Sequence, residues 1–416
     1  MACSTRTVPS WTQFPAELKY AVVDLLDEED VKCFSQASKE SYALCIPALF
    51  KNVNLRDHAS LISFLSNVPK TYARHTKTLT ICTAAADGSS TTSNAPTTEA
   101  LSELLGQCSQ LERLDIKLAN SVRPSVIPAF GGLHLLRELA LSNCGDENTC
   151  PLSERLAVSI AASLPKLQRL TLDRIARSAM HAPELVGCAS ASFVPVCTGD
   201  NDPCARYLRI RDTHLGDAAW STAPMQSAIE VLDLGSCYFE SPEFNRVCTE
   251  RIIGRIGDSV DEFSVNTPLK TDTYDFAKPV TTPLKRLRKV HLTPLLPVEN
   301  VVDTLTTLSG SPVEELSVSC HEDDVEDMRE ALQDFLSLRG EHPAELYPRL
   351  TEISLNAVGD DLESVKETMK FPVTSELPVS GDKGVQLPTV AIDASRLPCT
   401  NTQTQVPRLA RSMRDM

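Results

Sequence analysis

The strongest constraint on this chain of 416 residues is an apolar pattern that returns along most of its length. Two segments, one starting at Leu136 and one at Ile229, follow the order apolar-x-x-Leu-x-Leu-x-x-Cys. Other segments keep the central apolar residues, and the central positions of ten copies are 79, 114, 139, 170, 208, 232, 263, 290, 316 and 353. A unit repeated at such short intervals predicts a stack of supersecondary units, none of which buries its apolar face alone.

This pattern resembles the leucine-rich repeat, in which each unit contributes a strand and a helix. Apolar residues at helical spacing lie between the strand motifs, in segments 101–105, 156–160, 298–308 and 325–336. The resemblance implies an α/β solenoid of horseshoe shape over residues 56–370, with parallel strands on the concave face and helices on the convex face. The repeats are irregular, because several intervals exceed the roughly 20–29 residues of the family's unit.

Residues between the repeated apolar positions are expected to point away from the core, because side chains alternate along a strand. Here they are polar or charged, and we interpret this concave face as a surface that binds a partner protein. A solvated face without a partner is the alternative for any single residue. Arg and Tyr are the best candidates, because binding hot spots are enriched in them. The predicted partner-binding residues are Arg169, Tyr207, Arg209, Arg211, Asp233, Asn266 and His291.

Residues 12–55 do not follow the repeat, and they predict three short helices. Leu18, Val22 and Leu26 are spaced as one apolar stripe of a helix whose first turn tolerates Pro15. The acidic run 27–30 provides capping carboxylates for a second helix. A unit this small buries little apolar surface, so we expect it to dock on a neighbour or a partner.

The same segment, about a tenth of the chain, resembles an F-box. The matching residues are Phe14-Pro15, Glu17-Leu18, Val22, Leu26-Asp27, Asp30-Val31, Ser35, Ser38, Tyr42 and Leu49-Phe50. Three apolar replacements depart from the family pattern, namely Phe14 for Leu, Ala37 for Val and Phe50 for Trp. F-box domains bind the Skp adaptor of cullin-type ubiquitin ligases. The resemblance therefore implies adaptor-binding residues Phe14, Pro15, Leu18, Val22, Leu26 and Val31. A three-helix cap is the alternative, because repeat arrays need terminal caps.

The order of the two segments predicts the substrate-recognition subunit of a cullin-type (SCF) ubiquitin ligase. It would hold a Skp-type adaptor through the F-box-like module and a target protein through the repeats, and it would catalyse nothing itself. A repeat scaffold without a ligase is the alternative. A third hypothesis is an enzyme hidden in residues 176–204, which offer only His181, Cys188, Cys197 and Cys204. No nucleotide-binding, hydrolase or metalloprotease motif occurs, so we expect no catalytic residue, cofactor or metal site.

Composition excludes some classes of partner and favours one cellular location. The formal charge of −15 argues against nucleic acid, whose phosphates require an excess of Lys and Arg. No apolar stretch is long enough to cross a membrane, and the N-terminus lacks an apolar signal core, so we expect an intracellular protein, cytoplasmic or nuclear. The fourteen cysteines form no Cys-x-x-Cys pair, which favours reduced, mostly buried thiols over disulfides or a zinc site. Cys144 and Cys237 occupy the Asn/Cys position of the repeat and are expected to be buried.

Three interruptions and a tail complete the predicted organisation. Segments 82–98, 176–204 and 267–283 are rich in small residues, Pro and Gly, and they predict insertions between repeats. Residues 371–416 predict a tail with little structure of its own, although 390–392 could add a last strand. The basic cluster 285–289 is interpreted as the flank of a repeat strand rather than as a nuclear signal.

Overall fold

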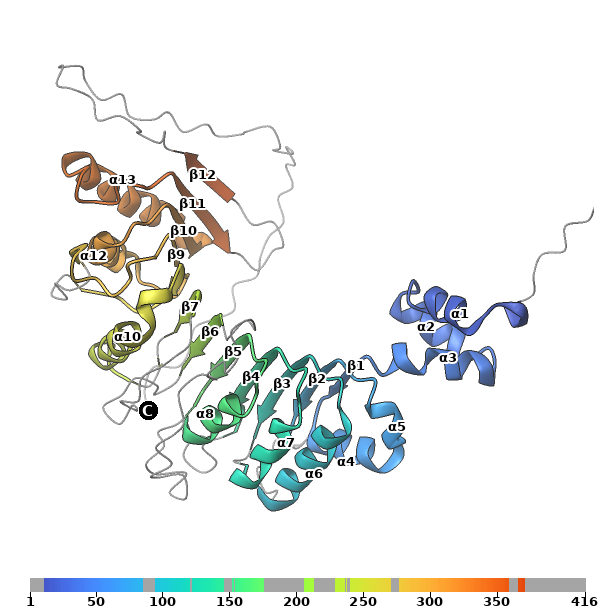
Figure 1. Cartoon of the computed structure of the whole chain (residues 1–416). Helices are drawn as coiled ribbons and strands as arrows, with labels where there is room; N and C mark the ends of the chain where they lie inside the picture. The colour runs from blue at the N-terminus through green and yellow to red at the C-terminus, as the bar shows by residue number, and fades with distance from the viewer. Residues whose placement is uncertain are drawn as a thin grey trace, which may run out of the picture.

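The computed structural model describes residues 11–84, 94–119, 122–145, 154–175, 206–212, 229–235, 240–270, 277–358 and 366–370, together with Leu152 and Cys237. Within these residues the strands form one curved sheet in chain order, and helices cover its outer face (Figure 1). The strands are β1 (Asn52–Leu55), β2 (Thr78–Cys82), β3 (Arg113–Leu118), β4 (Glu138–Asn143), β5 (Arg169–Asp173), β6 (Tyr207–Arg211), β7 (Val231–Leu234), β8 (Glu262–Val265), β9 (Lys289–Leu292), β10 (Glu315–His321), β11 (Glu352–Val358) and β12 (Lys366–Lys370).

The strands from β1 to β11 are parallel, and the predicted repeat explains their register. Every central apolar position of the repeat pairs with the central position of the next strand, and all of these side chains are buried. The row runs through Leu79, Leu114, Leu139, Leu170, Leu208, Leu232, Phe263, Val290, Leu316 and Ile353. The prediction of a mixed α/β fold with one parallel strand in each repeat is therefore confirmed.

The sheet has one more strand at each end than the repeat motifs predicted. It begins at β1, which lies within the predicted helical module 12–55, and Val53 of β1 pairs with Leu79 of β2. At the other end β12 pairs antiparallel with β11, with Lys370 opposite Glu352. Neither strand carries the leucine pattern, because a terminal strand packs against a neighbour on one side only. Each nevertheless covers a sheet edge whose backbone groups would otherwise lack partners.

Eleven labelled helices accompany the strands among the described residues. They are α1 (Ala16–Val23), α2 (Glu28–Ser35), α3 (Lys39–Leu49), α4 (His58–Asn67), α5 (Lys70–Ala73), α6 (Asn94–Gln107), α7 (Ile127–Gly131), α8 (Glu154–Ala162), α10 (Pro242–Ile256), α12 (Val301–Thr307) and α13 (Val325–Glu341). The four predicted stripes lie in α6, α8, α12 and α13 and their flanking turns. The acidic run at 322–327 forms a 3-10 turn and the start of α13, as its charge at a helix N-terminus predicts.

The first three helices have a small core of their own. Val23, Val31, Leu44 and Cys45 form it, separately from the long core of the repeats. Aromatic contacts of α3 and the residue after it join this helical module to the array, and the Phe50 ring lies 5.2 Å from the Tyr72 ring between centroids, at a tilt of 50°. In Figure 1 the module projects from the β1 end of the sheet.

The cysteine position of the repeat differs between its two copies. Cys237 is buried, as predicted. Cys144 is exposed, so its predicted burial is wrong. The reason is that β4 keeps strict alternation through Leu139, Leu141 and Asn143, which all face inward. The residue after Asn143 must then face outward, and Asn143 takes the inward slot.

Asn245 of α10 ties that helix to the turn after β7. Its Oδ1 accepts from the Cys237 backbone N–H at 2.8 Å, and its Nδ2 donates to the Cys237 carbonyl at 3.0 Å. Because both backbone groups are buried, we expect Asn245→Ala to lower the free energy of unfolding by about 2–4 kcal/mol. Urea denaturation followed by circular dichroism measures this loss. The exposed Asn67→Ala is the control, and equal effects of the two substitutions would contradict the prediction.

Asp57 caps α4 and makes its stability depend on pH. Its Oδ1 accepts hydrogen bonds from the Ser60 backbone N–H at 2.6 Å and from the Ser60 hydroxyl at 2.7 Å. The hydroxyl bond, then the backbone bond, lower the pKa of Asp57 below its ordinary value. The stabilising contribution is therefore complete above the unfolded-state pKa, about 4, and is lost as pH falls through the lower folded-state pKa.

Asp57→Asn keeps a capping side chain but removes this titration. We expect the difference in Tm between wild type and Asp57→Asn to be largest in favour of wild type near pH 7. It should shrink steadily as the pH falls below about 4. Differential scanning calorimetry at a series of pH values measures both proteins. A difference in Tm that stays constant with pH would contradict the assignment.

Candidate functional site

The outward side of α1 is apolar, although the helix lies at the surface. Leu18, Val22 and Leu25, in α1 and the turn after it, are 52%, 43% and 87% exposed. The inward side instead carries Val23 and Lys19, whose Nζ pairs with Glu40 Oε1 of α3 at 2.5 Å. Folding therefore leaves the larger apolar residues of α1 in water.

These exposed residues line an open depression, the α1 groove. Its walls are entirely apolar, and it encloses about 250 Å³. The lining residues are Trp11, Phe14, Leu18, Ala21, Val22 and Leu25. A water-exposed apolar groove on a module with so small a core is a surface suited to binding a partner.

The predicted adaptor-binding residues separate into two groups. Phe14, Leu18 and Val22 line the α1 groove, and Pro15 lies exposed before α1. Leu26 and Val31 instead belong to the small core of the module. The single stripe divides because α1 ends at Val23, so Leu26 lies in the turn before α2 and faces inward.

Trp11, Ala21 and Leu25 line the α1 groove but were not among the adaptor-binding residues predicted from the sequence. Trp11 precedes α1, and it packs edge-on against Phe34 at 5.4 Å between ring centroids. Only tertiary packing brings Trp11 to the groove, because it stands outside the helical spacing. Ala21, by contrast, lies three residues after Leu18 and could have been found from that spacing.

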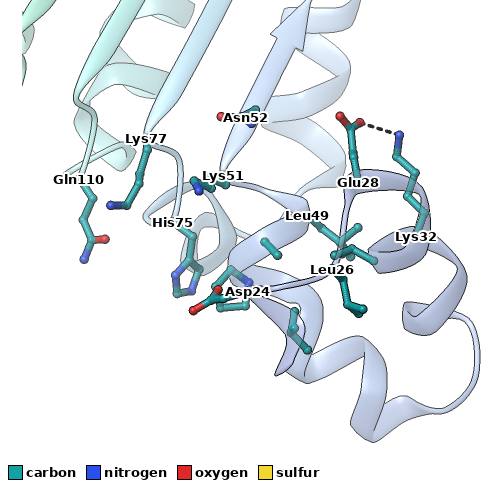
Figure 2. A pocket seen from close by; sticks show the side chains of 14 residues that line it. Asp24, Leu26, Glu28, Lys32, Leu49, Lys51, Asn52, His75, Lys77 and Gln110 are labelled. Atoms are coloured by element: carbon teal, nitrogen blue, oxygen red, sulfur yellow. Dashed lines mark hydrogen bonds and ion pairs between the residues drawn. The ribbon is translucent and has the colours of Figure 1, made fainter. Parts of the chain in front are cut away.

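A second, larger groove lies where the helical module meets the array (Figure 2). It encloses about 600 Å³, and charges of both signs line it. Lys32 pairs with Glu28 at 2.6 Å, and Lys77 pairs with Glu112 at 2.9 Å. The Lys51 carbonyl, between α3 and β1, accepts from the backbone N–H groups of Lys77 and Thr78, which joins the start of β1 to the start of β2. Because charged side chains line it, the junction groove is less suited than the α1 groove to an apolar partner.

On the concave face, charged side chains gather over β5, β6 and β7. We call Arg169, Tyr207, Arg209, Arg211 and Asp233 the arginine cluster. The ladder places Tyr207 beside Arg169, and Asp233 beside Arg209. Four of these five predicted residues are half-buried or exposed, and the structure brings all five together.

Asp233 is the centre of the arginine cluster. Its Oδ2 lies 3.3 Å from Arg209 Nε, and its Oδ1 accepts from Arg211 Nη2. Gly235 makes room for the Arg211 side chain, because a Cβ at that position would lie 2.5 Å from Arg211 Cδ. The Arg169 guanidinium lies over the Tyr207 ring, 4.8 Å from its centroid, in a cation–π contact.

Asn266 and His291 are the other two predicted concave residues, and a Cβ on Gly235 would lie 3.2 Å from Asn266 Nδ2, so this side chain is close to Arg211. Asn266 follows β8 and is buried, so its side chain does not reach the concave surface. His291 is half-buried on β9, and its Nε2 lies 3.2 Å from Glu262 Oε1. Asn266 departs from the strand alternation, because β8 ends at Val265 and both Val265 and Asn266 are buried.

Unusual backbone geometry adjoins the arginine cluster. Arg174 and Asp212, the residues directly after β5 and β6, have φ values of 54° and 41°. Non-glycine residues seldom occupy this region, and such residues concentrate at functional sites. Asp173 lies beside them, and burial followed by the nearby Asp212 carboxylate raises its pKa, although the neighbouring arginines oppose this.

The basic cluster 285–289 belongs to the repeats, as interpreted from the sequence. Leu287 is fully buried, and Lys289 Nζ pairs with Glu315 Oε2 at 2.8 Å. Arg288 and Lys285 lie near Asp261 and Asp258.

Several expectations concern residues that the structure does not describe. The enzyme hypothesis depends on His181, Cys188, Cys197 and Cys204, and the tail 371–416 with its possible strand at 390–392 lies outside as well. In the described part of the chain, no group of three metal-ligating side chains comes together. No helix there is long and apolar enough to cross a bilayer.

No protein-family model matches the chain, and no curated protein matches it. Among solved structures, the chain is similar to the leucine-rich repeat-containing protein LegL7 from Legionella pneumophila. The two are 13% identical with a TM-score of 0.34, over 69% of this chain and 97% of that one. A likeness at this level says nothing about what the present chain binds. The F-box resemblance of residues 12–55 thus remains a hypothesis.

Proposed function

We propose that this protein is a non-catalytic recognition subunit with two binding surfaces. The α1 groove would hold a Skp-type adaptor of a cullin ubiquitin ligase, and the concave face of the repeats would hold a target protein. The observation that carries the proposal is the exposure of Leu18, Val22 and Leu25 on a small module at one end of a long array. Full burial of an exposed apolar side chain is worth about 1.5–3 kcal/mol, and Leu18 and Val22, which are already about half buried, would each contribute about half of that.

Such a subunit needs no catalytic residue of its own. By holding a ligase component at one end and a target on the repeats, it would make the transfer reaction effectively intramolecular. The separation of the α1 groove from the arginine cluster along the sheet suits this division of labour, since two partners could bind without overlap (Figure 1).

Co-purification of the full chain with a Skp-type adaptor tests the ligase role. Binding through the α1 groove supports the proposal. A repeat scaffold without a ligase is the second candidate. The arginine cluster supports this candidate as well as it supports the ligase subunit. It would be preferred if the adaptor fails to bind while a target protein is still captured on the concave face.

A further inference from the structure

On its outer side the arginine cluster exposes guanidinium groups, while Asp233, the carboxylate that pairs with Arg209 and Arg211, is largely buried. Among the described residues, no carboxylate forms an ion pair with Arg169, and its guanidinium lies over the Tyr207 ring. Arg209 has its side chain 45% exposed, whereas Asp233 beneath it is 11% exposed. The carboxylate therefore lies below the surface, and the guanidinium groups face the solvent.

The inner side of the cluster holds these arginines in place. Asp233 binds Arg209 and Arg211 at once, and Arg211 lies over Gly235, where a side chain would displace it. The Nε of Arg211 is buried and has no hydrogen-bond partner. A guanidinium held in one position loses less conformational entropy when it binds a ligand than a free surface arginine does.

We propose that the arginine cluster binds an acidic segment of the partner protein, with Arg169 and Arg209 pairing with its carboxylates and Tyr207 packing against it. The inference rests on the proposed use of the concave face and names the chemistry of its ligand. Guanidinium groups bind carboxylates in a bidentate geometry. In the ladder Arg169 pairs with Tyr207 and Arg209 with Thr171, so the two arginines lie two register positions apart on adjacent strands. One segment that crosses the strands diagonally can reach both.

The overall charge makes this site unusual for the molecule. With a formal charge of −15, the chain as a whole repels polyanions, so non-specific binding of an acidic peptide is unfavourable. Any binding of such a peptide must come from a local positive surface. A simple polyanion can therefore distinguish a specific site from non-specific attraction.

The test uses the purified full chain and a fluorescein-labelled deca-glutamate peptide, with fluorescence anisotropy at low salt and at about 0.15 M salt. We expect wild type to bind, and Arg169→Gln with Arg209→Gln to weaken binding at least about tenfold. Arg113→Gln is the matched control, because Arg113 lies on the same face in β3 and already pairs with Glu138 at 3.4 Å. This control should bind like wild type.

Three results would overturn the proposal: no binding by wild type, equal weakening in Arg113→Gln, or a deca-uridylate RNA that binds as tightly through the same arginines. Arg169→Gln alone guards against misfolding, because that side chain has no ion pair to lose, and circular dichroism checks each variant. Adaptor capture by the double variant should be unchanged. A wild-type chain that binds the peptide but not the adaptor would refute the ligase role alone.

Discussion

Replacing both Leu18 and Val22 with aspartate should abolish binding of a Skp-type adaptor and leave the fold intact. Both side chains are about half exposed, so the substitutions cost little folding energy. In a complex, however, the new carboxylates would lie unpaired in an apolar interface. We expect affinity to fall at least about 100-fold, which corresponds to about 2.7 kcal/mol. Titration of the full-length variant with purified adaptor, by isothermal calorimetry, measures the change.

The matched control is Val280→Asp with Leu295→Asp. These side chains are 88% and 50% exposed, and they lie beside the repeats around β9, far from α1 along the chain. The control should bind the adaptor like wild type. If the α1 variant keeps its affinity, the adaptor does not use the α1 groove, and the ligase role loses its structural basis.

The second large effect concerns the stability of the array. Phe263 is fully buried in β8, and it is the aromatic member of a ladder row otherwise made of Leu, Val and Ile. Phe263→Ala should lower the free energy of unfolding by about 3–5 kcal/mol, because it leaves a cavity between β7 and β9. Since each repeat contacts only its neighbours, this loss also weakens the coupling between the two halves of the array.

Urea denaturation followed by circular dichroism should show an earlier and broader transition for Phe263→Ala than for wild type. Phe263→Leu, which supplies the residue type found at this position in most other repeats, should cost no more than about 1.5 kcal/mol. A loss below about 1 kcal/mol for Phe263→Ala would mean that the site collapses around the smaller side chain. The packing argument for this row would then be wrong.

Much of the repeat array could be predicted from the sequence, because its register follows from local periodicity. Once Leu139 and Leu170 are placed on strands of the same kind, parallel pairing of their repeats follows. The ends of the sheet could not be found this way. The pattern of β1 is Asn-Val-Asn-Leu, and β12 runs in the opposite direction, so neither shares the repeated unit.

The binding surfaces were only partly predictable for a different reason. Helical spacing identified Leu18 and Val22, but it could not show that their side of α1 faces water while Lys19 faces inward to Glu40. The stripe as a whole could equally have formed a core. Which side is buried depends on how α1 packs against α3, and that is a property of the tertiary structure.

The sequence by itself determined the architecture, because apolar side chains at a repeated spacing are buried when the repeats stack on one another. Only the tertiary structure decided which polar residues act together. Arg169, Arg209, Arg211 and Asp233 come from three strands separated by long insertions, and the ladder brings them within ion-pair distance or onto adjacent strands. The tertiary structure also buries Asn266, although the alternation of side chains along its strand had predicted it on the concave surface. Charges meet across strands through register, and register is a long-range property that no local pattern contains.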